Sequence, residues 1–515
     1  MSKKKCDKLI KQVNETLYKR DELIFKVITA ESSLSRSFSA ISFMHNELQL
    51  HSLLKKKTLK QAVANLKDEK NGVRRQHLKR IQHHQTHHSS ASKMEIIRKS
   101  MTMSASEKSW RKAREKGNYW SLSGAFERLV NISKKLGARK AKKLGTDSAY
   151  HALMDEFDPG RDAEHFDNIV NDITDYLRPK VKNIPKENTE NDTDKGLWSL
   201  PKHIQEELCK KILDHIGVDM DSLDYNEGPH PTCFGQKNRI LMTMSYDEDN
   251  FIIAALAAVH EGGHALFRQH TPDKYLDGPA AEVSSQSTDE AMALIFENAY
   301  GHSKGFAEWL LKTLKEDFGI ADKDMTAEKL HEQLNKQNLS MIRIETGEVA
   351  YPLHIVLRYN VARDMIDGDL TPNMMPIRWS TQEYVLFDNP EFEPSNALQD
   401  IHWYGGKIGY FPCYLSGTLM AAQMLEKAMD DNPDIQKGID NFDTKPLLNW
   451  LIDNVYSETP KLTSDELIEK VTGKKLDIEA YKKRIEKLPF MADNDNKKSS
   501  APAQHKTPKP HAPKH

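Results

Sequence analysis

The segment "AAVHEGGHALF", residues Ala257–Phe267, places two histidines four positions apart and a glutamate directly after the first. On an α-helix, residues i and i+4 share a face, so His260 and His264 can present ring nitrogens to one metal ion. Glu261 lies beside them. The chain has 22 histidines among 515 residues, so HExxH can also arise by chance. The motif therefore requires a helix beneath it, a third ligand and a substrate site.

The residues around the motif predict a buried helix. The stretch "FIIAALAAVHEGGHALFRQ", which begins at Phe251, is apolar on most faces for its first nine residues. An unpaired Glu261 would be costly in such a helix, which argues against two chance surface histidines. Gly262 and Gly263 each cost about 1 kcal/mol relative to alanine in mid-helix. That loss is understandable if something must approach this face of the helix closely.

This pattern of residue types is the one that a zinc peptidase needs. Zinc lowers the pKa of a bound water, and a neighbouring glutamate takes the proton as hydroxide attacks a carbonyl. A third ligand is expected from a nearby helix, and the stretch "STDEAMALIFENAYGHSKGF" follows at Ser287. Glu290 is the preferred ligand there. Asp289 and Glu297 compete with it, and spacing alone leaves the choice open.

Helical spacing of apolar residues dominates the rest of the chain. Residues 228–246 are the best strand candidate, because turn residues precede a run of Ile, Leu, Met and Thr. The segment "HHQTHHSSAS", His83–Ser92, is predicted as a solvated loop between helices, whose four histidines could bind metal adventitiously. Residues 491–515 are polar and rich in Pro and Lys, so a disordered tail is expected.

The bulk composition bounds the class of protein. Lys and Arg number 74 against 75 Asp and Glu, which argues against a dedicated nucleic-acid binder. The four cysteines are scattered without a CxxC pair, which favours a reduced, cytoplasmic protein. The basic N-terminus lacks the apolar core of a secretory signal, and no apolar run is long enough to span a bilayer, so no membrane partner is expected.

Two further motifs extend the pattern: "IRIETG" at Ile342–Gly347 and "NALQDIHWYGGKIGYFPCYLSGTLMAAQ" at Asn396–Gln423. With HExxH and "DEAMALIFEN" at Asp289–Asn298, they resemble the carboxypeptidase Taq family of zinc metallocarboxypeptidases. That family has a segment of the type HESQSRLWEN after HExxH, an IRxxAD motif and a GxxQDxHW motif. The resemblance covers residues 8–485; residues 1–100 match weakly, and the tail matches nothing.

The resemblance implies one mainly α domain over residues 1–490. Its expected form is an elongated helical zinc-peptidase fold with a deep central groove and a small β element next to the active site. A homodimer is implied as well. His260, His264 and Glu290 would hold Zn²⁺, with Co²⁺ or Mn²⁺ as alternatives, and Glu261 would activate water and then protonate the leaving amine. His402 and Tyr410 are expected to donate to the oxyanion, like the similarly spaced His and Tyr of angiotensin-converting enzyme.

A carboxypeptidase must also recognise a free carboxylate, for which the planar fork of arginine is suited. By resemblance, Arg343 is the expected clamp, and Arg239 and Arg358 are weaker alternatives. Several family positions are altered. The HPF motif reads "HPT" from His230, which stays a candidate substrate contact, and only Arg239 remains of DxRxT. Asp289 replaces the histidine before the third ligand, Asn396 replaces the glycine of GxxQDxHW, and Thr346-Gly347 replaces the AD of IRxxAD.

The sequence therefore predicts a zinc-dependent carboxypeptidase that removes C-terminal amino acids from peptides. The altered positions bear on substrate preference more than on metal binding. One alternative is a helical HExxH oligopeptidase that cuts internally, and a carboxyl-blocked peptide discriminates it. The other is a non-catalytic scaffold that keeps the fold, against which Glu261 argues because a scaffold has no chemical need for it.

Overall fold

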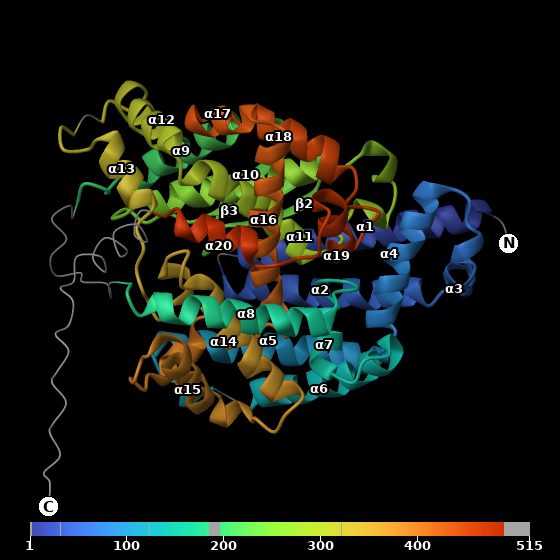
Figure 1. The fold of residues 1–515 in the computed structure, drawn as a ribbon. Coiled ribbons are helices and arrows are strands. Elements are labelled where there is room, and N and C mark those ends of the chain that lie inside the picture. Colours follow the sequence, from blue (N-terminus) through green and yellow to red (C-terminus); the bar gives the residue numbers. More distant parts are fainter. Residues whose placement is uncertain (1–2, 31, 123, 185–195, 321, 489–515) are drawn as a thin grey trace, which may run out of the picture.

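A computed structural model describes residues 3–30, 32–122, 124–184, 196–320 and 322–488, and this part of the chain is mainly helical (Figure 1). The predicted disordered tail at 491–515 lies outside the described residues. The α-helices are α1 Lys3–Ile28, α2 Ser33–Leu54, α3 Lys57–Ala64, α4 Gly72–His88, α5 Lys93–Glu115, α6 Ala125–Leu144, α7 Ala149–Met154, α8 Ala163–Val181, α9 Lys202–His215, α10 Phe251–Gln269, α11 Gln286–Phe296, α12 Lys304–Glu316, α13 Ala327–Leu334, α14 Tyr351–Ile366, α15 Met375–Phe387, α16 Pro412–Asp431, α17 Asp434–Asp440, α18 Lys445–Leu451, α19 Ser464–Thr472 and α20 Glu479–Glu486. The mainly helical class expected from the sequence is confirmed.

A small sheet lies against α10. Strands β1 Leu223–Glu227, β2 Thr232–Gln236 and β3 Arg239–Met244 form it in the order β1-β3-β2. β2 and β3 are an antiparallel hairpin inside the predicted strand region, whereas β1 precedes that region and pairs with β3 in parallel. Gly235 has a φ of +98°, and a Cβ there would lie 2.3 Å from the Arg239 carbonyl oxygen, so the hairpin requires glycine. β2 and β3 both contact α10, so the β element expected beside the HExxH helix is present.

The glycines of the HExxH helix allow two other helices to approach it. A Cβ on Gly262 would lie 2.3 Å from Cδ1 of Ile216, directly after α9. A Cβ on Gly263 would lie 2.7 Å from the Cα of Ala293 on α11. The close approach inferred from these glycines is therefore confirmed, and the approaching groups are helices. The packing brings α11 against the face of α10 that carries the histidines.

The N-terminal helices have a small core of their own, separate from the large core that runs from Trp110 to Leu488. α3 and α4 lie on the right of Figure 1, and α1 and α2 extend from there toward the middle; all four are at the blue end of its colour scale. Their buried apolar residues come from α1 to α4: Cys6, Ile10, Val13, Leu17, Leu50, Leu53, Leu54, Leu59, Ala62, Leu78 and Ile81. The single domain expected over residues 1–490 and its central groove stay predictions.

The predicted loop at His83–Ser92 is wrong. Its four histidines lie in the last turns of α4, and only the residues from Ser89 to Ser92 separate α4 from α5. His84 and His87 are buried and continue the inward-facing stripe begun by Leu78 and Ile81. Polar composition was misleading here, because the histidines are buried against specific carboxylates. His84 Nε2, for example, lies 2.8 Å from Glu282.

In the described part of the chain, no helix combines the length and the apolar character that crossing a bilayer requires.

Candidate metal centre and active site

Helices α10 and α11 bring three predicted ligands together. The ligand atoms of His260, His264 and Glu290 all lie within 4.8 Å of one another. His260 Nε2 is 4.0 Å from Glu290 Oε1, and the centroids of the two imidazole rings are 5.1 Å apart. Two imidazoles and one carboxylate are the donors that catalytic zinc takes, with a further position left for water. The arrangement therefore fits zinc.

Glu297 and Asp289, the other candidates for the third ligand, lie at the Nδ1 atoms of the two imidazole rings. Glu297 Oε2 lies 2.7 Å from His260 Nδ1, and Asp289 Oδ1 lies 3.0 Å from His264 Nδ1. Asp289 in turn accepts two hydrogen bonds from Arg268, at 2.8 and 2.7 Å. Carboxylates in this position fix the orientation of metal-binding histidines and leave Nε2 for the ion. The geometry thus favours Glu290 as the third ligand.

These orienting roles were missed in the sequence, although a signal for one of them was present. Glu290 and Glu297 are seven residues apart, which is close to two helical turns, so both face α10. Glu297 begins a short π-helical segment, Glu297–Gly301, that follows α11 directly. π-Segments within helices are frequent at functional sites. A second acidic residue two turns after a proposed ligand is therefore a candidate for orienting a histidine.

Burial and charge act against each other on these groups. Burial disfavours the charged form of His260, but the hydrogen bond and charge of Glu297 raise the pKa of His260 to about 10. Burial also opposes ionisation of Asp289, yet Arg268 and His264 hold the pKa of Asp289 well below its usual range. The pKa of Glu290 is raised, chiefly by burial. A metal ligand must be deprotonated, so binding of a cation here would release protons.

The glutamate of HExxH is buried and incompletely paired. The Glu261 side chain adjoins the triad, the residue is only 6 % exposed, and its Oε2 has no hydrogen-bond partner among the described residues. Buried polar atoms are nearly always paired, so a buried carboxylate oxygen without a partner suits a group that binds water or substrate. This position fits the general base predicted from the sequence.

The loop between the 3₁₀ segment Pro394–Leu398 and α16 carries His402 and Tyr410. Their rings stack, with centroids 5.4 Å apart at an interplanar angle of 25°. Gly409, with a φ of +101°, lies against the backbone of Leu153, where a Cβ would come within 2.8 Å. This contact requires glycine next to Tyr410 and holds the loop in place.

Of the two predicted oxyanion donors, Tyr410 is the one on which a charge of the triad acts directly. Burial raises the pKa of Tyr410 well above its ordinary value, and the charge of Glu290 contributes. Burial lowers the pKa of His402 to about 3, so its ring is neutral at physiological pH. His402 Nε2 lies 3.3 Å from the hydroxyl of Tyr414, whose pKa also responds to Glu290. Tyr414, a residue of α16, was not singled out in the sequence.

Arg343 and Arg358 share one carboxylate, Asp400. Arg343 donates to Asp400 Oδ1 from Nε and Nη2, at 3.2 and 2.8 Å, and from Nη1 to the Tyr351 hydroxyl at 2.9 Å. Arg358 is fully buried, and each of its three guanidinium nitrogens donates to a protein oxygen: Asp400, Gln399 or the His354 carbonyl. The charge of Glu290 also contributes to the raised pKa of Tyr351, which is about 12 and is raised chiefly by burial. Of the two arginines, Arg343 is the one that donates a hydrogen bond to Tyr351.

The remaining two candidates differ in position. His230 is exposed at the surface. Partial desolvation and the charges of Arg114 and Arg111 lower the pKa of this histidine, on which those of Asp400 and Arg343 act more weakly. Arg239 is about half exposed and binds Asp224 at 2.7 Å and Glu22 of α1 at 2.8 Å. His230 therefore lies within electrostatic range of Arg343, another predicted substrate contact. Arg239 is instead paired with Asp224 and Glu22.

Comparison with known proteins places this site in a family. The model of the family described as carboxypeptidase Taq (M32) metallopeptidase matches residues 7–488. Carboxypeptidase 1 of Bacillus subtilis (strain 168) is 28% identical over 378 residues, which cover 73% of this chain and 75% of that protein. Thermostable carboxypeptidase 1 of Pyrococcus furiosus is 28% identical over 396 residues, covering 75% of this chain and 78% of that protein.

The fold is shared with solved structures at low sequence identity. Metallocarboxypeptidase 1 of Trypanosoma cruzi superimposes with a TM-score of 0.84 at 23% identity, covering 94% of this chain and 98% of that chain. The M32 carboxypeptidase of Deinococcus radiodurans R1 gives a TM-score of 0.85 at 20% identity, with 94% and 97% covered. Since the family match spans nearly the whole described chain and contains the His260–His264–Glu290 triad, this protein belongs to the carboxypeptidase Taq (M32) family of metallopeptidases.

Proposed function

We propose that this protein is a zinc-dependent carboxypeptidase that removes amino acids from the C-terminus of peptides. The observation that carries the proposal is the triad of His260, His264 and Glu290, beside which Glu261 has a carboxylate oxygen without a hydrogen-bond partner in the described part of the chain. Bound zinc supplies Lewis acidity, which acidifies a water and polarises the scissile carbonyl. Co²⁺ and Mn²⁺ are proposed as alternative ions for the same donors.

The roles of the other residues follow from their positions. Glu261 takes a proton from the attacking water and returns it to the leaving amine. The pKa of Tyr410 is raised far above neutrality, so its hydroxyl stays protonated and can donate a hydrogen bond to a developing oxyanion. His402 is neutral and can donate from one ring nitrogen.

For the substrate carboxylate we retain Arg343 as the proposed clamp. Asp400 holds one edge of its guanidinium, and the hydroxyl of Tyr351 is the partner of the remaining nitrogen. A carboxylate could replace that neutral hydroxyl and form a stronger, charge-assisted bond. Arg358 is a poorer candidate because it is completely buried, whereas Arg343 remains 8% exposed. Arg239 remains an alternative, and His230 a proposed neighbour of the bound substrate.

One experiment separates the proposal from both alternatives. The purified protein is loaded with zinc and incubated with pairs of peptides that differ only in a free or an amidated C-terminus, and the products are read by mass spectrometry. We expect stepwise loss of single C-terminal residues from the free acids alone. Internal cleavage of both members of a pair would indicate an oligopeptidase. No cleavage by a folded, zinc-loaded protein would indicate a scaffold. The Glu261→Gln variant is the control for contaminating peptidases.

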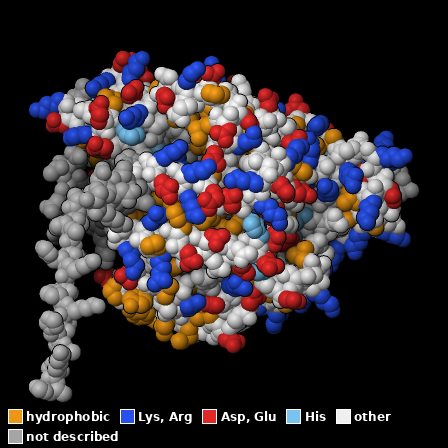
Figure 2. Space-filling view, viewed as in Figure 1, with side chains coloured by type: hydrophobic (Ala, Val, Ile, Leu, Met, Phe, Trp, Pro, Cys, Tyr) orange, Lys and Arg blue, Asp and Glu red, His pale blue; other side chains and the backbone are white. Residues whose placement is uncertain are grey.

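We also propose a homodimer. Hydrophobic side chains gather on the surface over α15, at the lower left of Figure 2. The exposed apolar residues in and beside that helix are Met374, Ile377, Tyr384, Val385 and Phe392. Large exposed apolar patches often mark interaction surfaces. Light scattering is expected to give twice the mass of the chain, and Ile377→Glu should lower it; a wild-type monomer would contradict the proposal.

A cytoplasmic location is likewise proposed. It is supported by the four cysteines, each buried and none in a disulfide. Cell fractionation with an antibody against the protein tests it, and recovery from a secreted or organellar fraction would contradict it.

A further inference from the structure

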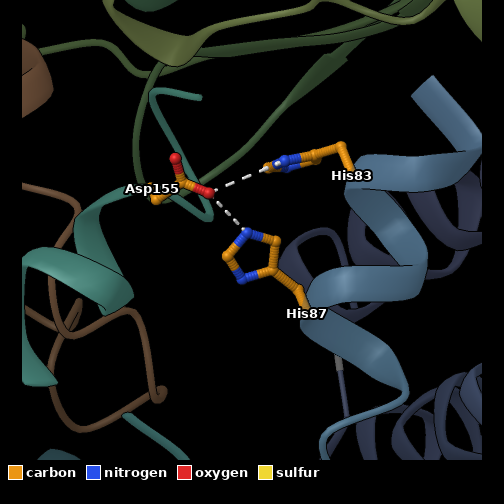
Figure 3. A group of neighbouring side chains, drawn as sticks. All are labelled: His83, His87 and Asp155. Carbon is orange, nitrogen blue, oxygen red and sulfur yellow. Dashed lines mark hydrogen bonds and ion pairs between the residues drawn. The ribbon is translucent and has the colours of Figure 1, made fainter. Parts of the chain in front are cut away.

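A second group of metal-ligand side chains lies outside the active site. His83 and His87 of α4 face Asp155, which directly follows α7, and their ligand atoms lie within 4.8 Å of one another (Figure 3). His87 Nε2 is 2.8 Å from Asp155 Oδ2, and His83 Nδ1 is 3.9 Å from the same oxygen. The two rings are 4.5 Å apart between centroids. The group thus repeats the i, i+4 histidine pair and single carboxylate of the catalytic triad.

The spacing is close to what a tetrahedral ion requires. Zinc–ligand bonds of 2.0–2.2 Å place neighbouring tetrahedral ligands about 3.3–3.6 Å apart. The distances of 2.8 and 3.9 Å lie on either side of that range. Small rotations of the side chains would therefore place all three donors around one ion. In Figure 3 both rings point toward the carboxylate of Asp155, so no change of rotamer is needed.

Neighbouring groups orient these side chains, as hydrogen bonds from surrounding residues commonly orient metal ligands. Asp155 Oδ1 accepts a hydrogen bond from the backbone N–H of Gly160 at 2.8 Å, which leaves Oδ2 for the histidines. Burial lowers the pKa of His83, and the backbone of Glu156, which lies near the His83 ring, also acts on it. The side chain of His87 is 3% exposed, that of His83 14% and that of Asp155 19%, so an ion would be partly shielded yet reachable from solvent.

The other two histidines of this segment have different partners. His84 Nε2 lies 2.8 Å from Glu282 Oε2, and Arg80 donates a hydrogen bond to the same oxygen. His88 lies 3.7 Å from Glu47. The pair at positions 83 and 87 is therefore distinguished from its neighbours by geometry, since it shares one carboxylate oxygen. His88, on the same helix and outside the group, supplies a matched control.

We propose that His83, His87 and Asp155 bind a divalent transition-metal ion, with Zn²⁺ the best match to two imidazoles and a carboxylate. The ion, with water as its fourth ligand, would link α4 to the segment 155–158. That segment supports the active site. Asp158 accepts hydrogen bonds from Ser285 and Ser287 at the start of α11, each at 2.7 Å, and Phe157 packs edge-on against Tyr410 with centroids 5.3 Å apart.

Counting bound metal tests the proposal without reference to activity. Metal-free protein is given excess Zn²⁺, separated from unbound ion by gel filtration and analysed by inductively coupled plasma mass spectrometry. We expect two zinc ions per wild-type chain, two in His88→Gln and one in the double variant His83→Ala/His87→Ala. The double variant His260→Ala/His264→Ala is expected to retain one ion. Because this variant lacks two residues of the catalytic triad, the result tests the proposed second site independently of metal binding at the first.

A second readout guards against a folding defect. Adding Zn²⁺ to His260→Ala/His264→Ala should raise its melting temperature, and Asp155→Asn in the same background should abolish that rise while keeping the size of the side chain. Cobalt in place of zinc should give visible absorption bands typical of tetrahedral Co²⁺ in the first protein and none in the second. The proposal is overturned if His260→Ala/His264→Ala, shown to be folded by circular dichroism, retains no zinc and gains no thermal stability from it.

Discussion

Replacing Gly417 by alanine tests whether the packing of two helices sets the geometry of the metal site. Gly417 lies on α16, directly against Glu290 on α11. A Cβ at this position would lie 2.7 Å from Cβ and 2.8 Å from Cγ of Glu290, and 3.2 Å from the carbonyl oxygen of Ser287. Carbon atoms in contact normally lie about 3.5–4.0 Å apart, so the added methyl requires a displacement of roughly 1 Å. Glu290 must move, because the rest of the contact is helix backbone.

The expected loss follows from that displacement. Metal–ligand distances are tolerant to about 0.2 Å, so a shift of roughly 1 Å takes the carboxylate out of its position. We expect the affinity for zinc to fall at least tenfold, which corresponds to about 1.4 kcal/mol. Overpacking between the two helices should also lower the free energy of unfolding of the metal-free protein by about 1–3 kcal/mol.

Zinc affinity is measured by competition with a chromogenic chelator, and stability by denaturant unfolding of the metal-free protein. Gly72→Ala is the matched control, because a Cβ at the first position of α4 meets nothing within 4 Å. It should leave affinity unchanged and stability equal or slightly higher. If Gly417→Ala binds zinc as tightly as the wild type while folded, the contact with Glu290 does not set the site, and the reasoning fails.

Four further outcomes are expected. Glu261→Gln should keep its zinc and lose ~10²–10⁴-fold in kcat, as removal of a general base does; near-normal turnover would exclude the proposed mechanism. Glu297→Gln should weaken zinc binding by about 10–100-fold because His260 loses its orienting partner, and an unchanged Kd by chelator competition would contradict this. Arg343→Ala should cost ~2–5 kcal/mol in kcat/KM on free-acid peptides and far less on amides; equal losses on both would indicate a structural arginine. Tyr410→Phe and His402→Gln should each lower kcat by ~10²–10³-fold with little change in KM. Since burial lowers the pKa of His402 to about 3, a shift of the acid limb of the pH–rate profile in His402→Gln would contradict the neutral donor.

Local patterns in the sequence determined the elements of this site. The apolar stretch from Phe251 to Gln269 predicts one buried helix, and α10 has those bounds, because helical periodicity is set by near neighbours in the chain. The spacing of His260 and His264 determines that both face one ion, whatever else surrounds them. A strand within residues 228–246 was likewise predicted from the turn residues and the β-favouring run, but the division of that region into the hairpin of β2 and β3 was not.

The spacing of residues left open which carboxylate joins the histidines, and the family resemblance implied Glu290; only the tertiary structure shows where each carboxylate lies. Asp289, Glu290 and Glu297 all belong to one short segment, and their roles depend on how α11 is rotated against α10. Gly263 allows α11 to lie close to α10. In this packing Glu290 lies on the Nε2 side of His260, and Glu297 and Asp289 lie at the Nδ1 atoms of His260 and His264.

The same reason explains the misread histidines of α4 and the pairing of Arg343 with Asp400. The partners of these side chains lie far along the chain: Glu282 is 198 residues from His84, and Asp400 is 57 residues from Arg343. No local pattern encodes such contacts. They form because the packed core brings distant segments together, and the burial that results makes each buried charge require a partner.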